Sequence, residues 1–94
     1  MITKSLSREC LLFHSLSDPT RLRVLELLRD EGETSVSLIA ETLGIGQSRL
    51  SFHLKALREA RLVKAEQDGR WVDYSLDPMG FGVMLEYLKK FRQR

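Results

Sequence analysis

The sequence predicts a small, mainly α-helical domain that carries one β-hairpin. Three observations support this fold class. Apolar residues recur at helical spacing through most of the chain, two helices flank a glycine turn near its middle, and an Asp-Gly pair joins two stretches rich in strand-forming residues. With 94 residues the chain is long enough for one domain, which we expect to span residues 1–94.

The composition is that of an ordinary folded protein, with 43% hydrophobic and 30% charged residues. No apolar run approaches the roughly 20 residues that a membrane-spanning helix needs, and the N-terminus lacks the apolar core of a signal peptide. The single cysteine permits no internal disulfide, which suits a reducing compartment. We therefore expect a cytoplasmic protein that does not contact a membrane.

No motif in the chain indicates an enzyme or calls for a cofactor. It has no phosphate-binding loop, no nucleophile motif and no pair of carboxylates with an evident partner. Glu41 and Glu59 are expected to be solvated helix residues. His53 lies beside an apolar stripe, so we expect it to be structural or to face a phosphate.

Positive charge is concentrated in one part of the chain, although the net charge is only +2. Six of the 15 Lys and Arg residues, but only three of the 13 Asp and Glu residues, lie between Gln47 and Arg70. Such clustering is typical of a surface that binds nucleic-acid phosphates. A solvated helix face would give the same excess, so charge alone does not decide between them.

The first helix is predicted from Thr3 to Ser15 and is apolar on two faces. A helix of that kind is usually buried on both sides, and in so small a chain a second subunit can supply one of them. The second helix begins at Asp18-Pro19, because Asp18 can cap it and Pro19 fits its first position. It ends near Gly32, and Thr34 begins a very short extended segment.

Two helices and a tight turn make up the centre of the chain. The first, Val36 to Leu43, has Ser35 as its cap, and Gly44 can take the left-handed conformation that ends a helix. The second is predicted from Gln47 to Ala60 and is called the reading helix below. Its apolar stripe consists of Leu50, Leu54 and Leu57.

The opposite side of the reading helix is polar. Short amide and hydroxyl side chains come first and cations follow: Gln47, Ser48, Ser51, Lys55 and Arg58. This surface is expected of a helix whose first turns enter a DNA major groove, where Gln pairs with adenine edges and cations hold phosphates. The same helix pair also occurs in proteins that bind no DNA, so this unit alone leaves both readings open.

A hairpin follows the reading helix. Leu62 to Glu66 and Trp71 to Leu76 are the predicted strands, and a turn from Gln67 to Arg70 joins them. Arg70 lies at the tip, free to touch a backbone phosphate or to reach a minor groove.

The last helix starts at Asp77-Pro78 and carries apolar residues at helical spacing as far as Phe91. Cations crowd its C-terminal end, where they oppose the helix dipole. Gly80 and Gly82 weaken its first turn.

Three stretches in register resemble the ArsR/SmtB family of bacterial winged-helix repressors. They are Leu16 to Arg23, Gln47 to Leu57, and Leu62-Val63 followed by Gly69 to Leu76. The resemblance implies a winged helix-turn-helix with five helices and a homodimer joined through the first and last helices. It also implies a reading helix in the major groove of operator DNA, a hairpin wing along the backbone, and release by a metal ion or another inducer.

Pattern and resemblance together give the candidate site residues. The DNA-binding candidates are Gln47, Ser48, Arg49, Ser51, Phe52, Lys55 and Arg70. The dimer candidates are Leu6, Phe13, Leu85, Leu88 and Phe91. Relatives often carry a cation or His where this chain has Phe52, which either contacts a thymine methyl group or packs locally. Gly46 replaces the Ser that usually caps the reading helix.

The metal ligands of familiar relatives are missing from this chain. Arsenic- and cadmium-sensing relatives carry a Cys-x-Cys pair where this chain has Ser35-Val36-Ser37. Zinc-sensing relatives place an Asp and His residues along the last helix, which here has no His or Cys and only Glu86 as a carboxylate. We therefore expect neither metal site, and the inducer is left open. Cys10 and His14, one helical turn apart, are the remaining sensor candidates, although we expect Cys10 to be a buried apolar residue.

The leading hypothesis is a dimeric, sequence-specific repressor of this type without the usual metal sites. The alternative is a winged-helix dimer that serves as a protein-interaction module, with weak or no DNA binding. The polar face of the reading helix favours DNA, whereas an apolar patch around Phe52 would favour a protein partner.

Overall fold

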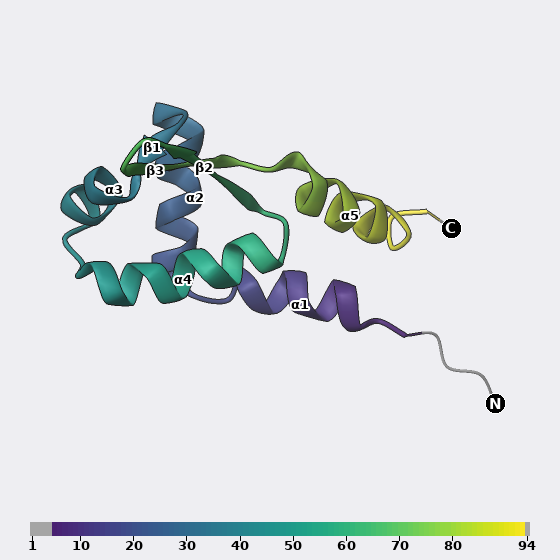
Figure 1. Ribbon diagram of the computed structural model, residues 1–94. Helices are drawn as coiled ribbons and strands as arrows, with labels where there is room; N and C mark the ends of the chain where they lie inside the picture. Colours follow the sequence, from purple (N-terminus) through teal and green to yellow (C-terminus); the bar gives the residue numbers. More distant parts are fainter. Residues whose placement is uncertain (1–4, 94) are drawn as a thin grey trace.

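The computed structural model of the protein describes residues 5–93 (Figure 1). These residues form five helices and a three-stranded antiparallel sheet in the order β1-β3-β2. The elements are α1 (Ser7–Ser15), α2 (Pro19–Glu31), β1 (Thr34–Ser35), α3 (Val36–Leu43), α4 (Gln47–Glu59), β2 (Val63–Asp68), β3 (Trp71–Leu76) and α5 (Pro78–Lys89). The mainly helical fold class with a hairpin wing is confirmed.

The molecule is elongated, with extents of 51 × 25 × 23 Å. Helices α2, α3 and α4 and the sheet form its wide end, and α1 and α5 lie side by side and extend away from it (Figure 1). No helix among residues 5–93 is long and apolar enough to cross a membrane.

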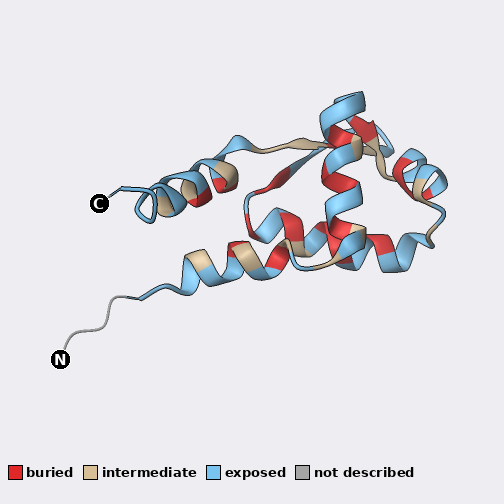
Figure 2. Cartoon of the chain, turned by 180° about the vertical axis from the view of Figure 1, so that it is seen from behind, coloured by how far each residue is buried: buried red, intermediate tan, exposed pale blue. Residues whose placement is uncertain are grey.

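The hydrophobic core lies between α2, α3, α4 and the sheet. The apolar stripe of α4 is fully buried there, as its spacing predicts, against Val24 and Leu28 of α2, Ile39 of α3, and Leu62 and Val63. Helix α5 contributes little to this core, and most of its residues are exposed (Figure 2). The wide end therefore has a core of its own, whereas α1 and α5 have mainly each other.

Side-chain caps fix where α2 and α3 begin. Asp18 Oδ1 accepts from the backbone N–H groups of Thr20 (2.8 Å) and Arg21 (3.3 Å), and Ser35 Oγ accepts from that of Leu38 (3.2 Å). Gly44 ends α3 in the left-handed conformation, with φ 68°. The predicted starts of α2 and α3 are therefore confirmed. Helix α4 also begins at Gln47 as predicted, although Gly46 supplies no side-chain cap.

The wing is longer than predicted, and its turn is shorter. Asp68 pairs with Trp71, so Gln67 and Asp68 belong to β2 and the turn consists of Gly69 and Arg70 alone. Gly69 has φ 63°, and a glycine with positive φ at the first turn position matches the twist of a tight hairpin. The predicted turn was wrong because it lies one residue too early in the chain: its two central residues are Asp68 and Gly69, whereas Gly69 and Arg70 occupy those positions in the structure.

A third strand joins the wing to the rest of the domain. Thr34 pairs with Tyr74 of β3, so the short extended segment predicted at Thr34 becomes edge strand β1. The side chain of Thr34 is buried, and its hydroxyl donates to the carbonyl of Gly32 over 2.8 Å. The hairpin is thereby anchored beside α2 and α3.

Three predicted helix ends differ from the structure. The first helix begins at Ser7, because Ser5 and Leu6 are not helical; the predicted start at Thr3 lies outside the described residues. The reading helix ends at Glu59, one residue early, and the last helix ends at Lys89, so Phe91 follows it in a turn.

The end of α4 and the start of α5 are joined by backbone contacts. Arg61 takes a left-handed conformation with φ 60°, and the N–H of Leu62 donates to the carbonyl of Leu57 over 3.0 Å, which closes the helix end. The N–H of Gly80 donates to the carbonyl of Arg61 over 2.8 Å. A Cβ atom on Gly80 would lie 2.6 Å from the carbonyl oxygen of Ala60, so this close approach requires glycine.

Candidate nucleic-acid interface

All seven candidate DNA-binding residues are exposed. Six of them lie on α4, and the side chains that α4 buries are Leu50, His53, Leu54 and Leu57. Arg70 is at the wing tip, in the two-residue turn. The helix therefore divides into a buried face and a free face, as its sequence pattern predicts.

A hollow of about 600 Å³ separates α4 from the wing. Helix α4 contributes Gln47, Ser51 and Arg58 to it, and the wing contributes Gln67, Arg70, Trp71 and Tyr74 among its lining residues. The structure thus brings three of the seven candidates to one concave surface. The other four, Ser48, Arg49, Phe52 and Lys55, lie on the rest of the exposed face of α4.

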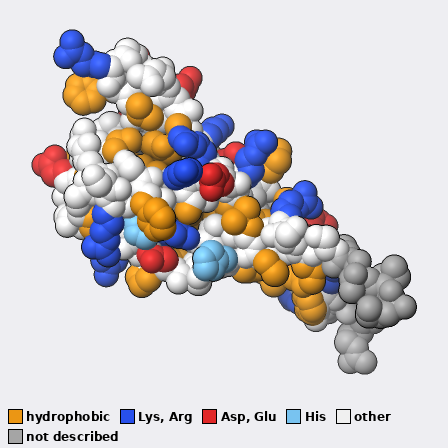
Figure 3. All heavy atoms as spheres, turned by 60° about the horizontal axis from the view of Figure 1, so that its bottom comes forward, with side chains coloured by type: hydrophobic (Ala, Val, Ile, Leu, Met, Phe, Trp, Pro, Cys, Tyr) orange, Lys and Arg blue, Asp and Glu red, His pale blue; other side chains and the backbone are white. Residues whose placement is uncertain are grey.

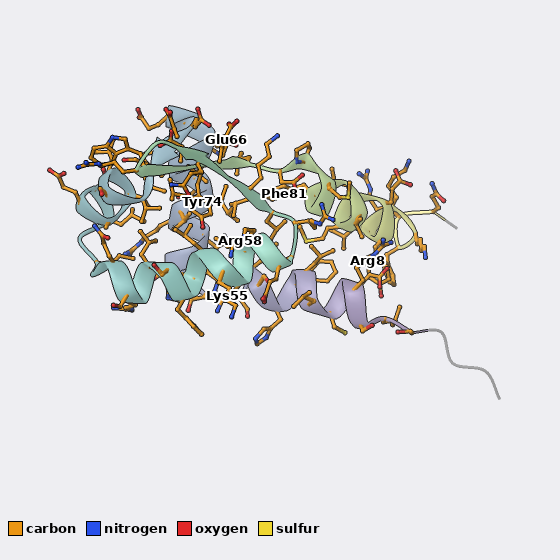
Figure 4. All side chains as sticks on the ribbon, viewed as in Figure 1. Arg8, Lys55, Arg58, Glu66, Tyr74 and Phe81 are labelled. Atoms are coloured by element: carbon orange, nitrogen blue, oxygen red, sulfur yellow. The ribbon has the colours of Figure 1, made fainter. Side chains whose placement is uncertain are left out.

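Arg58 crosses from the helix to the sheet. Its Nη1 donates to Tyr74 Oη over 3.1 Å, and both side chains lie between α4 and the sheet in Figure 4. The Tyr74 ring is buried, with 6% of the residue exposed, and β3 is the central strand of the sheet. The guanidinium is therefore held from one side while its remaining N–H groups are free to donate elsewhere.

The two faces of the wing differ in charge. Ala65 faces the hollow, and Gln67 borders both the hollow and an acidic recess on the other side. Four carboxylates line that recess: Glu33, Glu66, Asp68 and Asp73. Burial raises the pKa of Glu33, and the neighbouring carboxylates raise it further. A polyanion is therefore favoured on the hollow side of the wing and repelled on the other.

His53 lies on the buried face of α4 and does not line the hollow. It is 6% exposed, and its Nδ1 accepts a hydrogen bond from Arg21 Nε over 3.0 Å. The Phe52 ring stands edge-on to the His53 ring. The Arg21 guanidinium lies 5.7 Å from the centroid of the Phe52 ring. Of the two roles expected for His53, the structure assigns the structural one.

The sequence left two alternatives for Phe52, local packing or a contact with a thymine methyl group, and its position is compatible with both. It packs against its neighbours, yet 65% of it stays exposed on the face that α4 presents to solvent. Figure 3 brings this underside of the molecule forward and shows Lys and Arg side chains gathered beside apolar ones. The face seen in this view is therefore mixed, with cationic side chains next to apolar ones.

Cys10 and His14 are both exposed in the single chain. The expectation that Cys10 is buried was wrong, because the buried side of α1 consists of Leu12 and Ser15 and nothing in the described chain covers the opposite side. Among residues 5–93, no three His, Cys, Asp or Glu side chains lie together as a metal would require. The residues at the arsenic and zinc positions of the family do not fit those ions either.

The five dimer candidates lie along α1 and α5 or at their ends. Leu6, Leu85, Leu88 and Phe91 are exposed, at 38%, 63%, 47% and 68%. Phe13 is half-buried, and its ring lies 6.0 Å from that of Tyr87 in α5. These two helices thus contact each other and leave a further apolar surface uncovered.

Sequence reasoning did not select the wing residues that complete the hollow, namely Gln67, Trp71 and Tyr74. It counted Arg58 among the cations of the reading helix that hold phosphates, but did not include it in the candidate site residues. A signal for Arg58 was available. Gln47, Ser51 and Arg58 are four and seven residues apart, which places them on one side of a helix. No comparable signal identified Tyr74, because its partner depends on how the sheet packs.

A helix pair with a glycine turn, an exposed second helix and a hairpin beside it define the winged helix-turn-helix class. Residues 18–65 match the model of the "Bacterial regulatory protein, arsR family". The HTH-type regulator MJ1325 of Methanocaldococcus jannaschii, itself uncharacterized, is 40% identical over 63 residues, 67% of this chain and 71% of that protein.

Two further comparisons agree. The arsenical resistance operon repressor of Escherichia coli is 40% identical over 67 residues, which cover 71% of this chain but only 57% of the repressor. The solved structure of HlyU from Vibrio cholerae has a TM-score of 0.75 and 30% identity, and the match covers 96% of this chain and 97% of HlyU. The chain belongs to the ArsR family of transcriptional regulators, which confirms the resemblance.

Proposed function

We propose that the protein is a homodimeric, sequence-specific repressor that does not use the arsenic or zinc ligands of its relatives. One observation carries the DNA-binding part of this proposal: all seven candidate residues are exposed together on α4 and the wing. The exposed apolar side chains of α1 and α5 support the dimer. The residues at the known metal positions support a different kind of inducer, or none.

In this proposal α4 enters the major groove of each half-site. Gln47, Ser48 and Ser51, in its first turns, read base edges, and Lys55 holds phosphate. Arg70 at the wing tip touches the DNA backbone or the neighbouring minor groove. The acidic recess on the far side of the wing keeps the DNA on the side of the hollow.

The test is a fluorescence-anisotropy titration with two DNAs: the sequence upstream of the protein's own gene, and mixed genomic DNA. We expect tighter binding to the first and a steep loss of affinity for both as salt rises. Equal affinity for both would contradict sequence-specific recognition.

A second candidate function is that of a protein-interaction module, because Phe52 is 65% exposed. An exposed aromatic ring on the outer helix would suit a protein partner. Absence of DNA binding even at low salt would favour this interaction module over a repressor.

A further inference from the structure

We propose that the hollow between α4 and the wing holds a phosphate of the DNA backbone, and that Arg58, positioned by the Tyr74 hydroxyl, is its principal ligand. This inference rests on the proposed DNA binding. It adds a contact between Arg58 and a phosphate, a role for Tyr74 in holding Arg58, and the position of one DNA strand in the hollow. Figure 4 shows the two side chains between the reading helix and the sheet.

The lining of the hollow suits an anion. Arg58 and Arg70 approach from the helix and from the wing tip, and Gln47 and Ser51 add neutral hydrogen-bonding groups. Gln67 also lines the hollow, with its amide nitrogen donating to the carbonyl of Gly69. None of its lining residues is a carboxylate. The carboxylates of the wing lie in the acidic recess on its other face. The local charge therefore directs a phosphate to this side.

Arg58 is available for such a contact. The salt bridges of the described chain join Arg29 to Asp30 and Lys89 to Glu86, and neither involves Arg58. Its hydrogen bond to Tyr74 Oη uses one of five N–H donors. A planar guanidinium with free donors matches phosphate oxygens in pairs, which a lysine ammonium does not.

Tyr74 is a rigid support. Its ring is buried, and its backbone pairs with Thr34 on one side and Ala65 on the other. A flexible arginine normally loses rotamer freedom when it binds, and a side chain already held in place loses less. The hydroxyl therefore contributes to affinity without needing to touch the DNA, which makes Tyr74 a positioning residue.

The experiment measures affinity for mixed-sequence double-stranded DNA across several salt concentrations. Arg58→Ala is expected to weaken binding to all sequences and to reduce the slope of log affinity against log salt by about one unit. Tyr74→Phe is expected to keep the wild-type slope and to lose roughly three- to ten-fold in affinity, the equivalent of one hydrogen bond. Arg58→Lys should behave like Tyr74→Phe, and it changes only a surface residue.

Two controls separate positioning from general damage. Gln93→Ala removes a polar side chain beyond the end of α5, outside the hollow, and should leave affinity and slope unchanged. Tyr74→Phe should have no further effect when Arg58 is already Ala, because its influence acts through that side chain. Circular dichroism of each variant checks that the fold is retained.

The outcomes distinguish this inference from the function on which it rests. A wild-type protein that binds no DNA at low salt overturns both. A wild-type protein that binds DNA, with an Arg58→Ala variant of unchanged slope, overturns only the inference. The positioning role of Tyr74 is overturned by full affinity in Tyr74→Phe, or by an equal loss when Arg58 is absent.

Discussion

One hydrogen bond between side chains ties the reading helix to the start of α2. Arg21 Nε donates to His53 Nδ1 over 3.0 Å, and both residues are buried. The bond requires an unprotonated Nδ1, because a protonated ring nitrogen cannot accept. Burial lowers the pKa of His53 below its ordinary value of 6.5. The nearby Asp18 carboxylate opposes this shift, whereas Arg21 and Arg49 add to it.

The free energy of unfolding should therefore fall as the pH falls below about 6.5. The unfolded chain protonates His53 near 6.5, whereas the folded chain resists protonation, so the unfolded state binds more protons in this window. The decline ends below the lowered pKa of the folded state. Urea unfolding at about pH 7.5 and about pH 5.5 measures the difference.

Two histidine variants identify the source of this pH dependence. His53→Gln keeps an acceptor for Arg21 but does not titrate, so its stability should change less between the two pH values. His14→Gln changes the other, exposed histidine and should match the wild type. A decline as steep in His53→Gln as in the wild type would contradict the assignment. Asp18 does not account for a decline in this pH range. Burial acts to raise the pKa of Asp18, but hydrogen bonds from the N–H groups of Arg21 and Thr20 outweigh burial and hold this pKa below 3.8. The contribution of Asp18 to the free energy of unfolding is therefore lost only in more acidic solution.

Gln47 and Ser51 test whether the reading helix selects sequence. Both side chains lie near the start of α4, where base edges are reached, and both line the hollow. Replacing either with Ala should cost about 1–3 kcal/mol on the cognate operator and much less on random DNA. Gln93→Ala, beyond the end of α5, serves as the matched control. Equal losses on both DNAs would show that these residues do not read bases.

At the level of the elements, the junction between α4 and α5 depends on Gly80. A Cβ atom there would meet the backbone oxygens of Ala60 at 2.6 Å and of Arg61 at 2.7 Å, neither of which can rotate away. Gly80→Ala should therefore lower the free energy of unfolding by about 1–3 kcal/mol, as overpacking does.

Gly82 provides the matched control within the same helix. A Cβ atom at Gly82 would have no neighbour within 4 Å, so alanine there should stabilise α5 by up to about 1 kcal/mol through its helix propensity. Urea unfolding of both variants checks the pair. Destabilisation of the same size at both positions would show that helix propensity, and not the close contact, governs this segment.

Local chemistry made most element starts predictable. Asp18, Ser35 and Asp77 cap the helices that follow them, and each lies next to a recognisable apolar pattern. The end of α4 was less visible, because Arg61 occupies a left-handed position where glycine is usual. The sequence predicted only that Gly80 weakens the first turn of α5. Its close contact with the end of α4 exists only in the folded chain and could not be predicted.

The same division applies to the candidate site. Helical spacing placed Gln47 and Ser51 on the free face of α4, because that periodicity is local. The bond from Arg58 to Tyr74 joins residues 16 positions apart, and it depends on the register of β3 against β2 and on how the sheet packs against α4. Tertiary geometry of that kind leaves no periodic trace in the sequence.

For the whole molecule, the side chains at the metal-binding positions of the family argue against release from DNA by a metal ion. Zinc, cadmium and arsenite need two to four well-placed thiolate, imidazole or carboxylate ligands. The start of α3 offers Ser35 and Ser37, and α5 offers Glu86. We expect none of the three, at low micromolar concentration, to release the protein from its operator. Release by a stoichiometric ion that is lost in Cys10→Ser would overturn this and make Cys10 and His14 a sensor site.

The long, narrow end of the molecule leads to the last prediction, which concerns assembly. Helices α1 and α5 extend from the compact core, and Leu85 and Leu88 of α5 and Phe91 just beyond it are exposed. So much apolar surface on a chain of 94 residues is typical of an interface. A two-fold dimer through these helices would bring two reading helices to successive major grooves about 34 Å apart.

Leu88→Glu should convert the dimer into a monomer and weaken operator binding, because each subunit would bring a carboxylate into the apolar seam. Sedimentation at micromolar concentration measures the assembly, and circular dichroism distinguishes a folded monomer from an unfolded chain. Gln93→Glu adds the same charge near the same helix end without removing an apolar side chain, and it should stay dimeric. A wild-type monomer under these conditions would refute the dimer, and tight binding to a two-fold operator would then lack its geometric basis.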